Sequence, residues 1–156
     1  MAIAHTVKLF LDTHHVAYDV VRHSPAISSM KTAAAAHVPG NRLAKSVILK
    51  DETGYVMAIL PSTHRVELGR LHRELHRPLG LATENEVSGI FNDCDLGAIP
   101  ALGPAYGILT VVDEALTGQP DIYFEAGDHE ELIHISGPEY QSLMSDARHG
   151  QISQHI

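Results

Sequence analysis

Apolar residues recur along this chain at two spacings, one typical of helices and the other of strands. Spacings of three and four residues predict helices that lay one apolar face on a core. Short alternating or continuous apolar runs between turn residues predict strands. The predicted helices cover residues 3–14, 30–37, 66–76, 84–90 and 137–144. The predicted strands cover residues 18–22, 43–50, 55–61, 108–112, 122–125 and 132–135.

Capping and turn residues mark where these elements begin and end. Ser28 or Ser29 can cap the alanine-rich second helix, and capping boxes at 83–86 and 136–139 begin two others. Residues 51–54 contain a glycine and separate two strands, which predicts a hairpin. Because strands and helices are mixed without strict alternation, we expect an α+β fold rather than a doubly wound parallel sheet.

Length and composition fit one globular domain over residues 1–156. The chain has 156 residues, 44% of them hydrophobic, enough to bury about two thirds of its unfolded surface. We place the core at about 18–144 and expect the polar tail, 145–156, to fray. No apolar run approaches the roughly 20 residues of a membrane span, and the N-terminus lacks a leader pattern, so we expect a cytoplasmic protein. The single cysteine, Cys94, agrees with a reducing compartment.

One lysine stands out in the strand LAKSVILK. Because side chains alternate across a strand, Lys45 shares its face with Leu43, Val47 and Leu49. Burying an ammonium among these residues costs free energy unless an anion meets it. Lys45 is therefore a candidate for anion binding or proton chemistry. The alternative is that its charged head reaches water along an apolar stem.

The segment 96–107 fits neither spacing and holds three glycines and two prolines, which indicates a shaped loop. Glycines let the backbone approach a small zwitterion such as an amino acid and present N–H or C=O groups to it; a plain turn is the other interpretation. Asp113, which ends a strand, is either a cap or a site carboxylate, and His129 follows another strand. The candidate binding residues are Gly97, Ala98, Ile99, Pro100, Ala101, Leu102, Gly103, Asp113 and His129.

Other common chemistries lack their signatures. His72 and His76 lie one helical turn apart, but Arg73 stands where a zinc protease has its glutamate and would repel a divalent cation, so we expect no metal. Cys94 lies between two aspartates, which raise the pKa of its thiol and disfavour a nucleophile. The chain has no GxSxG, GxxxxGK[ST] or GxGxxG motif.

The net charge of −8 disfavours a general nucleic-acid or DNA binder, but the charge is unevenly distributed. Residues 1–77 hold ten Lys and Arg against six acids, a net charge of +4. The remainder holds one arginine against thirteen acids, a net charge of −12. The fold can gather the first set into a basic face for one polyanion, or it can interleave the two halves so that no basic face exists.

Five collinear segments resemble the YbaK family, also called the prolyl-tRNA synthetase-associated editing domain. They are HSPAISSMKTAAAAH, LAKSVILK with VMAILPSTHRVEL, the loop LGAIPALG, the strand that ends at Asp113, and FEAGDHEELIHIS, and together they span about residues 23–144. The resemblance implies an α+β fold with a curved mixed sheet surrounded by helices. It also implies hydrolysis of the ester that joins a wrong amino acid to tRNA.

The resemblance also suggests roles for individual residues. A strand lysine is the functional hallmark of the family, and Lys45 matches it. The family loop is usually written GxxxP; here Gly97 is in place, but Ala101 occupies the proline position and Pro100 lies one residue earlier. Asp113 and His129 match positions near the family's pocket. No synthetase is attached, so we expect a free-standing enzyme that acts in trans.

The expected function is therefore an aminoacyl-tRNA deacylase for a small amino acid, Ala, Cys, Ser or Thr, with proline tRNA as one candidate acceptor. In this hypothesis Lys45 holds the terminal adenosine, loop backbone groups surround the amino acid, and water or the ribose 2′-hydroxyl assists attack. The expected partners are a mischarged tRNA and, as an option, an aminoacyl-tRNA synthetase, with no cofactor and no membrane. The altered loop keeps open a second interpretation, a catalytically weak module that binds an aminoacyl or nucleotide ligand.

Overall fold

The computed structural model describes residues 3–26 and 28–156. The helices are α1 (His5–Thr13), α2 (Ser29–Ala35), α3 (Leu68–Leu75), α4 (Glu84–Ile90) and α5 (Gly137–Leu143), with short 3-10 turns η1 (Gly40–Arg42), η2 (Gly103–Tyr106) and η3 (Glu114–Leu116). The strands are β1 (Asp19–Arg22), β2 (Ala44–Asp51), β3 (Gly54–Pro61), β4 (His64–Val66), β5 (Gly80–Leu81), β6 (Leu109–Asp113), β7 (Asp121–Glu125), β8 (Glu131–Ser136), β9 (Arg148–Gly150) and β10 (Ser153–His155). These elements confirm the predicted α+β class.

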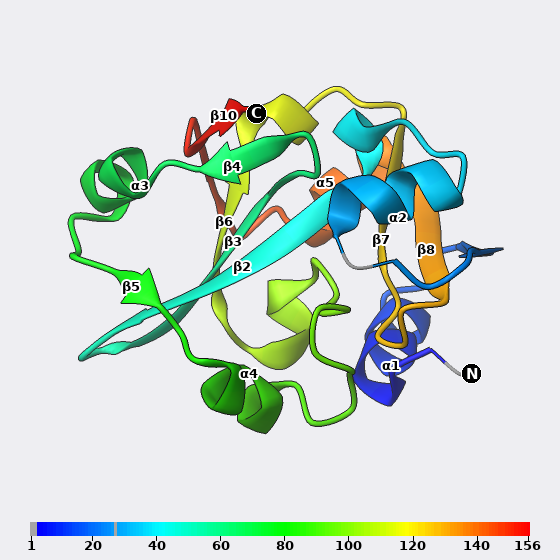
Figure 1. The fold of residues 1–156 in the computed structure, drawn as a ribbon, viewed down its shortest axis with the longest axis horizontal. Coiled ribbons are helices and arrows are strands. Elements are labelled where there is room, and N and C mark those ends of the chain that lie inside the picture. Colours follow the sequence, from blue (N-terminus) through cyan, green and yellow to red (C-terminus); the bar gives the residue numbers. More distant parts are fainter. Residues whose placement is uncertain (1–2, 27) are drawn as a thin grey trace.

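A mixed sheet with the strand order β5-β2-β3-β6-β9 forms one side of the molecule (Figure 1). β2 and β3 make the predicted hairpin and pair antiparallel, with Lys45 opposite Leu60, whereas β3 and β6 run parallel. Residues 56–61 of β3 are buried. Both faces of this strand are apolar because it lies between two partners and is covered on both sides.

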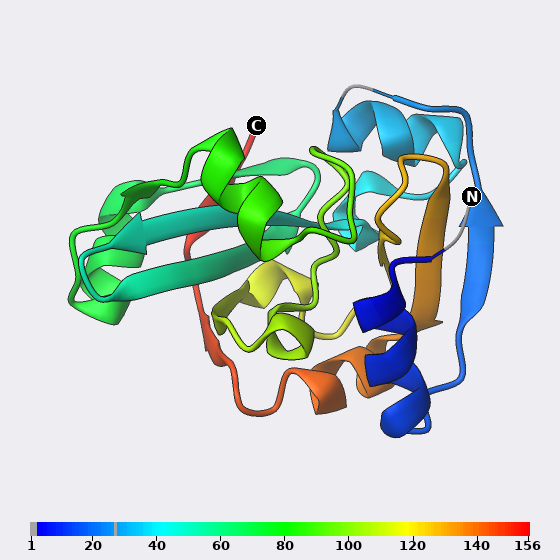
Figure 2. The ribbon, with the colours of Figure 1, turned by 90° about the horizontal axis from the view of Figure 1, so that it is seen from below.

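A second sheet, β1-β8-β7, is antiparallel and lies beside the first (Figure 2). A parallel bridge between Leu43 and Tyr123 connects the two sheets just before the start of β2. The largest core cluster fills the space between them with residues such as Met57, Phe124 and Tyr140. The junction of the two sheets therefore fixes the relative position of the start of β2 and the end of β7.

The capping signals act as expected. Ser28 is the cap of α2 and accepts a hydrogen bond from the backbone N–H of Lys31 at 3.2 Å. Thr83 and Glu86 form a full capping box at the start of α4. Ser136 caps α5 through the backbone N–H of residue 139. These caps satisfy backbone donors that a helix leaves unpaired at its N-terminus.

The C-terminal tail is ordered, so the expectation that residues 145–156 fray is wrong. β9 pairs parallel to β6 and β10 pairs antiparallel to β4. Ile152 is fully buried between them, and Asp113 accepts hydrogen bonds from the Ile152 N–H at 3.0 Å and from Ser153 Oγ at 2.6 Å. The buried side chains of Ile152 and Asp113 therefore hold the tail in place, although its polar composition did not predict a strand.

Within the described residues, no helix has both the length and the apolar character to cross a bilayer.

Candidate functional site

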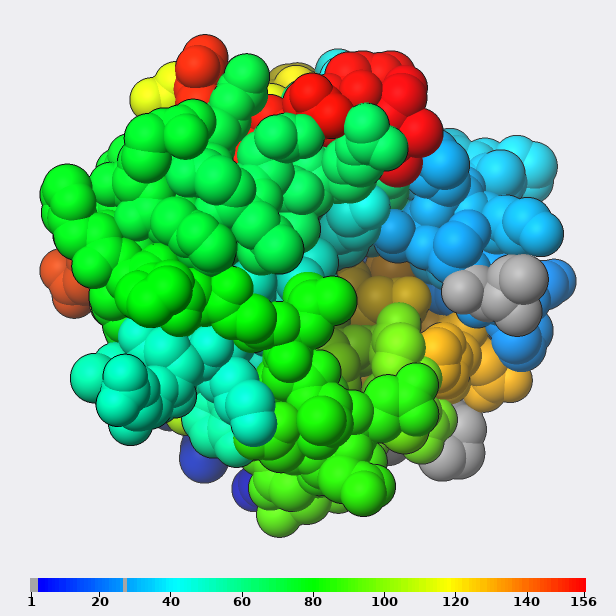
Figure 3. Space-filling model, turned by 60° about the vertical axis from the view of Figure 1, so that its left-hand side comes forward, coloured from blue at the N-terminus to red at the C-terminus, as the bar shows by residue number. Residues whose placement is uncertain are grey.

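A cavity of about 170 Å³ opens where α2, the start of β2, the loop after α4 and the end of β7 meet. Figure 3 shows it as a hollow between the blue α2, the cyan β2 and the gold end of β7. The described residues that line it are Ser28, Ser29, Leu43, Ala44, Lys45, Ser46, Gly97, Ile99 and Glu125. A cavity of about 150 Å³ accommodates a benzene molecule, so this one has room for a small amino acid.

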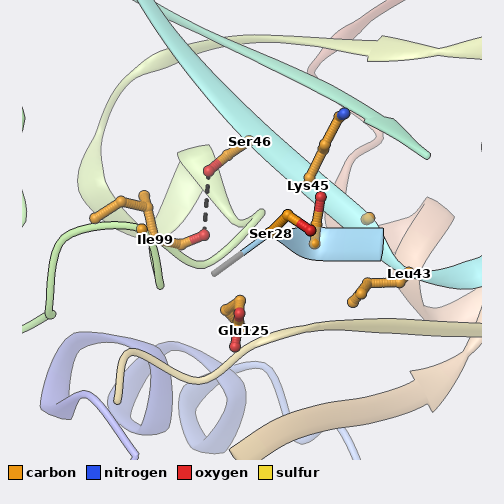
Figure 4. A pocket seen from close by; sticks show the side chains of 9 residues that line it. Ser28, Leu43, Lys45, Ser46, Ile99 and Glu125 are labelled. Carbon is orange, nitrogen blue, oxygen red and sulfur yellow. Dashed lines mark hydrogen bonds between the residues drawn. The ribbon is translucent and has the colours of Figure 1, made fainter. Parts of the chain in front are cut away.

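Lys45 lies at the rim of this cavity, on the second residue of β2 (Figure 4). Its side chain is half-buried, and burial lowers the pKa of its ammonium below the ordinary value. Among the described residues, no carboxylate forms an ion pair with it and no acceptor takes its hydrogen bonds. A partly desolvated cation without a protein anion is suited to bind an anionic or oxygen-rich ligand.

The loop reaches the cavity through Gly97 and Ile99. Gly97 has a φ of +82°, and a Cβ there would lie 3.0 Å from Cε1 of His129. Glycine is required at this position because a side chain would be both strained and crowded. Ser46 Oγ donates a hydrogen bond to the Ile99 carbonyl at 3.1 Å, and so fastens the loop to the strand that carries Lys45.

The other loop candidates point into the protein. Ala98, Ala101 and Leu102 are fully buried, and Tyr140 donates a hydrogen bond to the Ala101 carbonyl at 2.7 Å. Pro100 is buried as well, and Gly103 lies against the side chain of Thr110. Among the described cavity-lining residues these five do not appear. They shape the loop from behind and do not form the wall of the cavity.

Asp113 and His129, the remaining candidates, lie in different places. Asp113 is buried at the end of β6, where it caps η3 through the N–H of Ala115 and anchors the tail. His129 has a φ of +63° in the turn between β7 and β8, and its Nε2 contacts the Leu96 carbonyl. The structure thus places His129 directly behind Gly97, while Asp113 lies outside the cavity wall.

Sequence reasoning missed Glu125, which ends β7 and lines the cavity opposite the loop. The residue is 8% exposed, and burial, helped by the nearby Asp128 carboxylate, raises its pKa from 4.5 to about 7. Its Oε1 lies 3.8 Å from Nε2 of His23 and has no hydrogen-bond partner among the described residues. The signal was the same as for Lys45, a charged residue at the end of the apolar strand 122–125.

The structure also shows the surroundings of the cysteine and histidine residues for which the sequence disfavoured a nucleophilic or metal-binding role. The thiol of Cys94 contacts Asp93 and Tyr106, and its pKa rises to about 12, mainly because of burial. Nε2 of His72 contacts the backbone of Leu79. Within residues 3–26 and 28–156, no group of three or more His, Cys, Asp or Glu side chains could hold a metal ion.

Ion pairs connect the basic and acidic halves of the chain. The pairs between them are Arg22–Glu131 at 3.6 Å, Arg42–Asp121 at 3.6 Å and Lys50–Glu86 at 2.7 Å. The two halves therefore interleave at these points. Three exposed arginines on β4 and α3, Arg65, Arg70 and Arg73, form no such pair among the described residues, and we call them the basic strip.

Solved structures share this fold, and two of them serve for comparison. A hypothetical protein, APE2540, superposes with a TM-score of 0.83 at 21% identity, over 96% of this chain and 99% of its own. A "putative trans-editing enzyme for prolyl tRNA synthetase" superposes with a TM-score of 0.81 at 23% identity, over 97% of this chain and 96% of its own. A comparison with curated proteins found no match.

The sequence matches the family described as aminoacyl-tRNA editing domain over residues 23–143. This range contains every described residue that lines the cavity, from Ser28 to Glu125. The fold is the single-domain α+β fold of a YbaK-like editing domain, as the sequence predicted. The chain belongs to the aminoacyl-tRNA editing domain family.

Proposed function

We propose that this protein is a trans-acting deacylase that hydrolyses the ester of a tRNA mischarged with Ala, Cys, Ser or Thr. The observation that carries the proposal is the half-buried ammonium of Lys45, which pairs with no carboxylate among the described residues and lies at the rim of a small cavity. Family membership supports the reaction class. The substrate is a mischarged tRNA, with proline tRNA as one candidate and the cytoplasm as the expected location.

The size of the cavity supports the choice of small amino acids. Leu43, Ala44 and Ile99 give it apolar walls, and Ser28 and Ser46 contribute hydroxyl groups. Because about 150 Å³ accommodates the six carbon atoms of benzene, a volume of about 170 Å³ suits a whole aminoacyl group whose side chain has one to three non-hydrogen atoms. An aromatic amino acid released as fast as alanine would contradict this part of the proposal.

The proposed reaction needs no protein nucleophile, because an aminoacyl ester is already an activated acyl group. Lys45 holds phosphate or ribose oxygens of the terminal adenosine, and this places the ester at the cavity. Water, assisted by the ribose 2′-hydroxyl, adds to the carbonyl carbon. The bond from that carbon to the ribose oxygen breaks, the ribose oxygen takes a proton, and the free amino acid leaves.

Backbone donors in the loop are available to the oxyanion that forms in this step. Gly97 and Ile99 both line the cavity, and among the described residues neither backbone N–H has a protein acceptor. Preorganised N–H groups stabilise a developing negative charge at little reorganisation cost. The bonds from Ser46 and Tyr140 to loop carbonyls keep these donors in place.

The test is release of the amino acid from Ala-, Cys-, Ser- and Thr-tRNA by the wild type, Lys45→Ala and Lys50→Ala. Lys50 is the matched control because it lies on the same strand but pairs with Glu86 outside the cavity. We expect Lys45→Ala to lose about 100-fold in kcat/KM and Lys50→Ala to retain activity. Full activity in Lys45→Ala would contradict the mechanism.

A second candidate is a module that binds an aminoacyl or nucleotide ligand without efficient hydrolysis. The observation in its favour is that Ala101 stands at the usual proline position of the family loop, with Pro100 one residue earlier. Binding of tRNA with no release from any of the four substrates would favour this candidate. A gain of activity in Pro100→Ala with Ala101→Pro would identify the altered loop as the cause.

A further inference from the structure

Glu125 is a buried carboxylate that accepts no hydrogen bond from the described residues, and its nearest ionisable neighbour, Nε2 of His23, lies 3.8 Å away. Glu125 is 8% exposed. Ionising a carboxyl group in such a place costs several kcal/mol unless a donor or cation meets it. A glutamine or leucine would fill the same space at lower cost. The cavity side is where a compensating group from a ligand can arrive, because Glu125 is part of the cavity wall.

The charges of the cavity are arranged with opposite signs at opposite ends. In the view of Figure 4, the Lys45 ammonium and the Glu125 carboxylate lie far apart, with Ser28 between them. Among the described lining residues these two carry the only formal charges; the others are apolar or hydroxyl-bearing. A ligand that fits this cavity therefore has an anionic end and a cationic end, separated by an uncharged segment.

The end of an aminoacyl-tRNA has this arrangement of charges. The phosphate of the terminal nucleotide is anionic, the ester is uncharged, and the amino acid carries an α-ammonium group. On the basis of the proposed function, we infer that Glu125 binds the α-ammonium group of the aminoacyl moiety. Lys45 and Glu125 then hold the two ends of the substrate and present the ester between them to the loop.

Two polar side chains lie near the Glu125 carboxylate, those of His23 and Asp128. His23 lies 3.8 Å away, and its Nδ1 contacts the Ser24 carbonyl at 2.8 Å, which orients the ring. Asp128 accepts hydrogen bonds from the N–H groups of residues 130 and 131 at 3.0 Å through Oδ1, while its Oδ2 has no described partner. The negative potential of Asp128 adds to that of Glu125 and favours a cation in the cavity.

The inference predicts discrimination between an amine and a hydroxyl of the same size. The substrates are tRNA charged with alanine and tRNA charged with lactic acid, in which a hydroxyl replaces the amine. A hydrogen bond between charged groups contributes about 1.5–3 kcal/mol, so we expect the wild type to prefer the alanyl ester at least tenfold in kcat/KM. The enzymes are the wild type, Glu125→Gln, and Glu130→Gln as a control that removes an exposed charge from the neighbouring turn.

In Glu125→Gln we expect kcat/KM for the alanyl ester to fall about tenfold or more, mainly because KM rises. We expect kcat/KM for the lactyl ester to stay within about twofold of the wild-type value. The preference then disappears in this variant and persists in Glu130→Gln. Thermal melting of each variant confirms that it is folded. If Glu125→Gln does not fold, the wild-type preference still tests the inference, because equal rates on the two esters overturn it.

The other outcomes separate this inference from the proposed function. If a folded Glu125→Gln variant loses kcat/KM equally for both esters, the carboxylate acts in proton transfer or in structure. That result would overturn ammonium binding. Lysine-dependent release of both esters without preference would overturn the inference and leave the deacylase intact. Release of neither ester by the wild type would overturn both.

Discussion

Ser46 Oγ donates a hydrogen bond to the Ile99 carbonyl at 3.1 Å, and this contact joins the loop to the strand beside Lys45. The two residues lie 53 positions apart in sequence, yet both line the cavity. Because side chains alternate along β2, Ser46 and Lys45 leave the strand on opposite sides. Ser46 therefore fixes the loop, and Lys45 remains available to the substrate.

Replacing Ser46 with alanine should reduce the deacylation rate strongly and the free energy of unfolding only slightly. Loss of one hydrogen bond costs about 1 kcal/mol of unfolding free energy, whereas a loosened loop should lower kcat/KM for alanyl-tRNA about tenfold. Deacylation kinetics and chemical denaturation measure the two effects. The control is Ser142→Ala, an exposed serine on α5. Unchanged kinetics in Ser46→Ala would show that the loop does not depend on this contact.

The buried Glu125 should make the protein less stable as the pH rises. Its pKa is raised from 4.5 to about 7, so the folded state binds this proton more tightly than the unfolded state does. The unfolding free energy should therefore fall between pH 4.5 and 7 and level off above that, with a total contribution of about 3 kcal/mol at most. The charged and titratable groups near it are Asp128, whose carboxylate adds to the rise of this pKa, His23 at 3.8 Å, and Lys45, which lines the same cavity.

Glu125→Gln isolates this contribution. We expect the variant to match the wild type near pH 4.5 and to exceed its unfolding free energy above pH 7, as measured by denaturant titration at both pH values. Glu130→Gln, which removes an exposed carboxylate nearby, should follow the wild type. If the unfolding free energies of Glu125→Gln and the wild type differ by the same amount at all pH values, burial does not shift the pKa of Glu125.

The basic strip should carry part of the affinity for tRNA. Arg65 and Arg73 are exposed and without a described ion pair, so each substitution to alanine should raise the Kd for tRNA a few-fold and reduce the salt dependence by about one counterion. Binding measured at several salt concentrations gives this slope. Lys8→Ala is the control, because Lys8 lies on α1 and pairs with Asp12. If the salt dependence of tRNA binding is the same in all variants, the tRNA does not contact the basic strip.

Cys94 should be unreactive and dispensable for catalysis. Burial raises the pKa of its thiol to about 12, so very little thiolate is present at pH 8 and alkylation by iodoacetamide should be much slower than for a free thiol. Mass spectrometry over time follows the modification. We expect Cys94→Ala to keep its deacylation rate, and a large loss in a folded variant would reopen the nucleophile hypothesis.

Much of the fold could be predicted because the signals are local. The hairpin followed from two apolar runs around a glycine turn, and the caps at Ser28 and Thr83 followed from residue type and spacing. The order of the tail was not predictable in this way. β9 and β10 exist because β6 and β4 offer free edges and because Asp113 meets Ile152, contacts that link distant parts of the chain.

The sequence by itself determined the fold class, the family resemblance and the unusual position of Lys45, because alternation along one strand is enough to show a charge among apolar residues. Only the tertiary structure decided which residues share the cavity. It brought Glu125 and Ser28 to the same cavity as Lys45, and it turned Ala98 and Ala101 into the core. The physical reason is that a cavity forms where segments far apart in sequence pack imperfectly, and that packing depends on contacts between sheets, which no local pattern encodes.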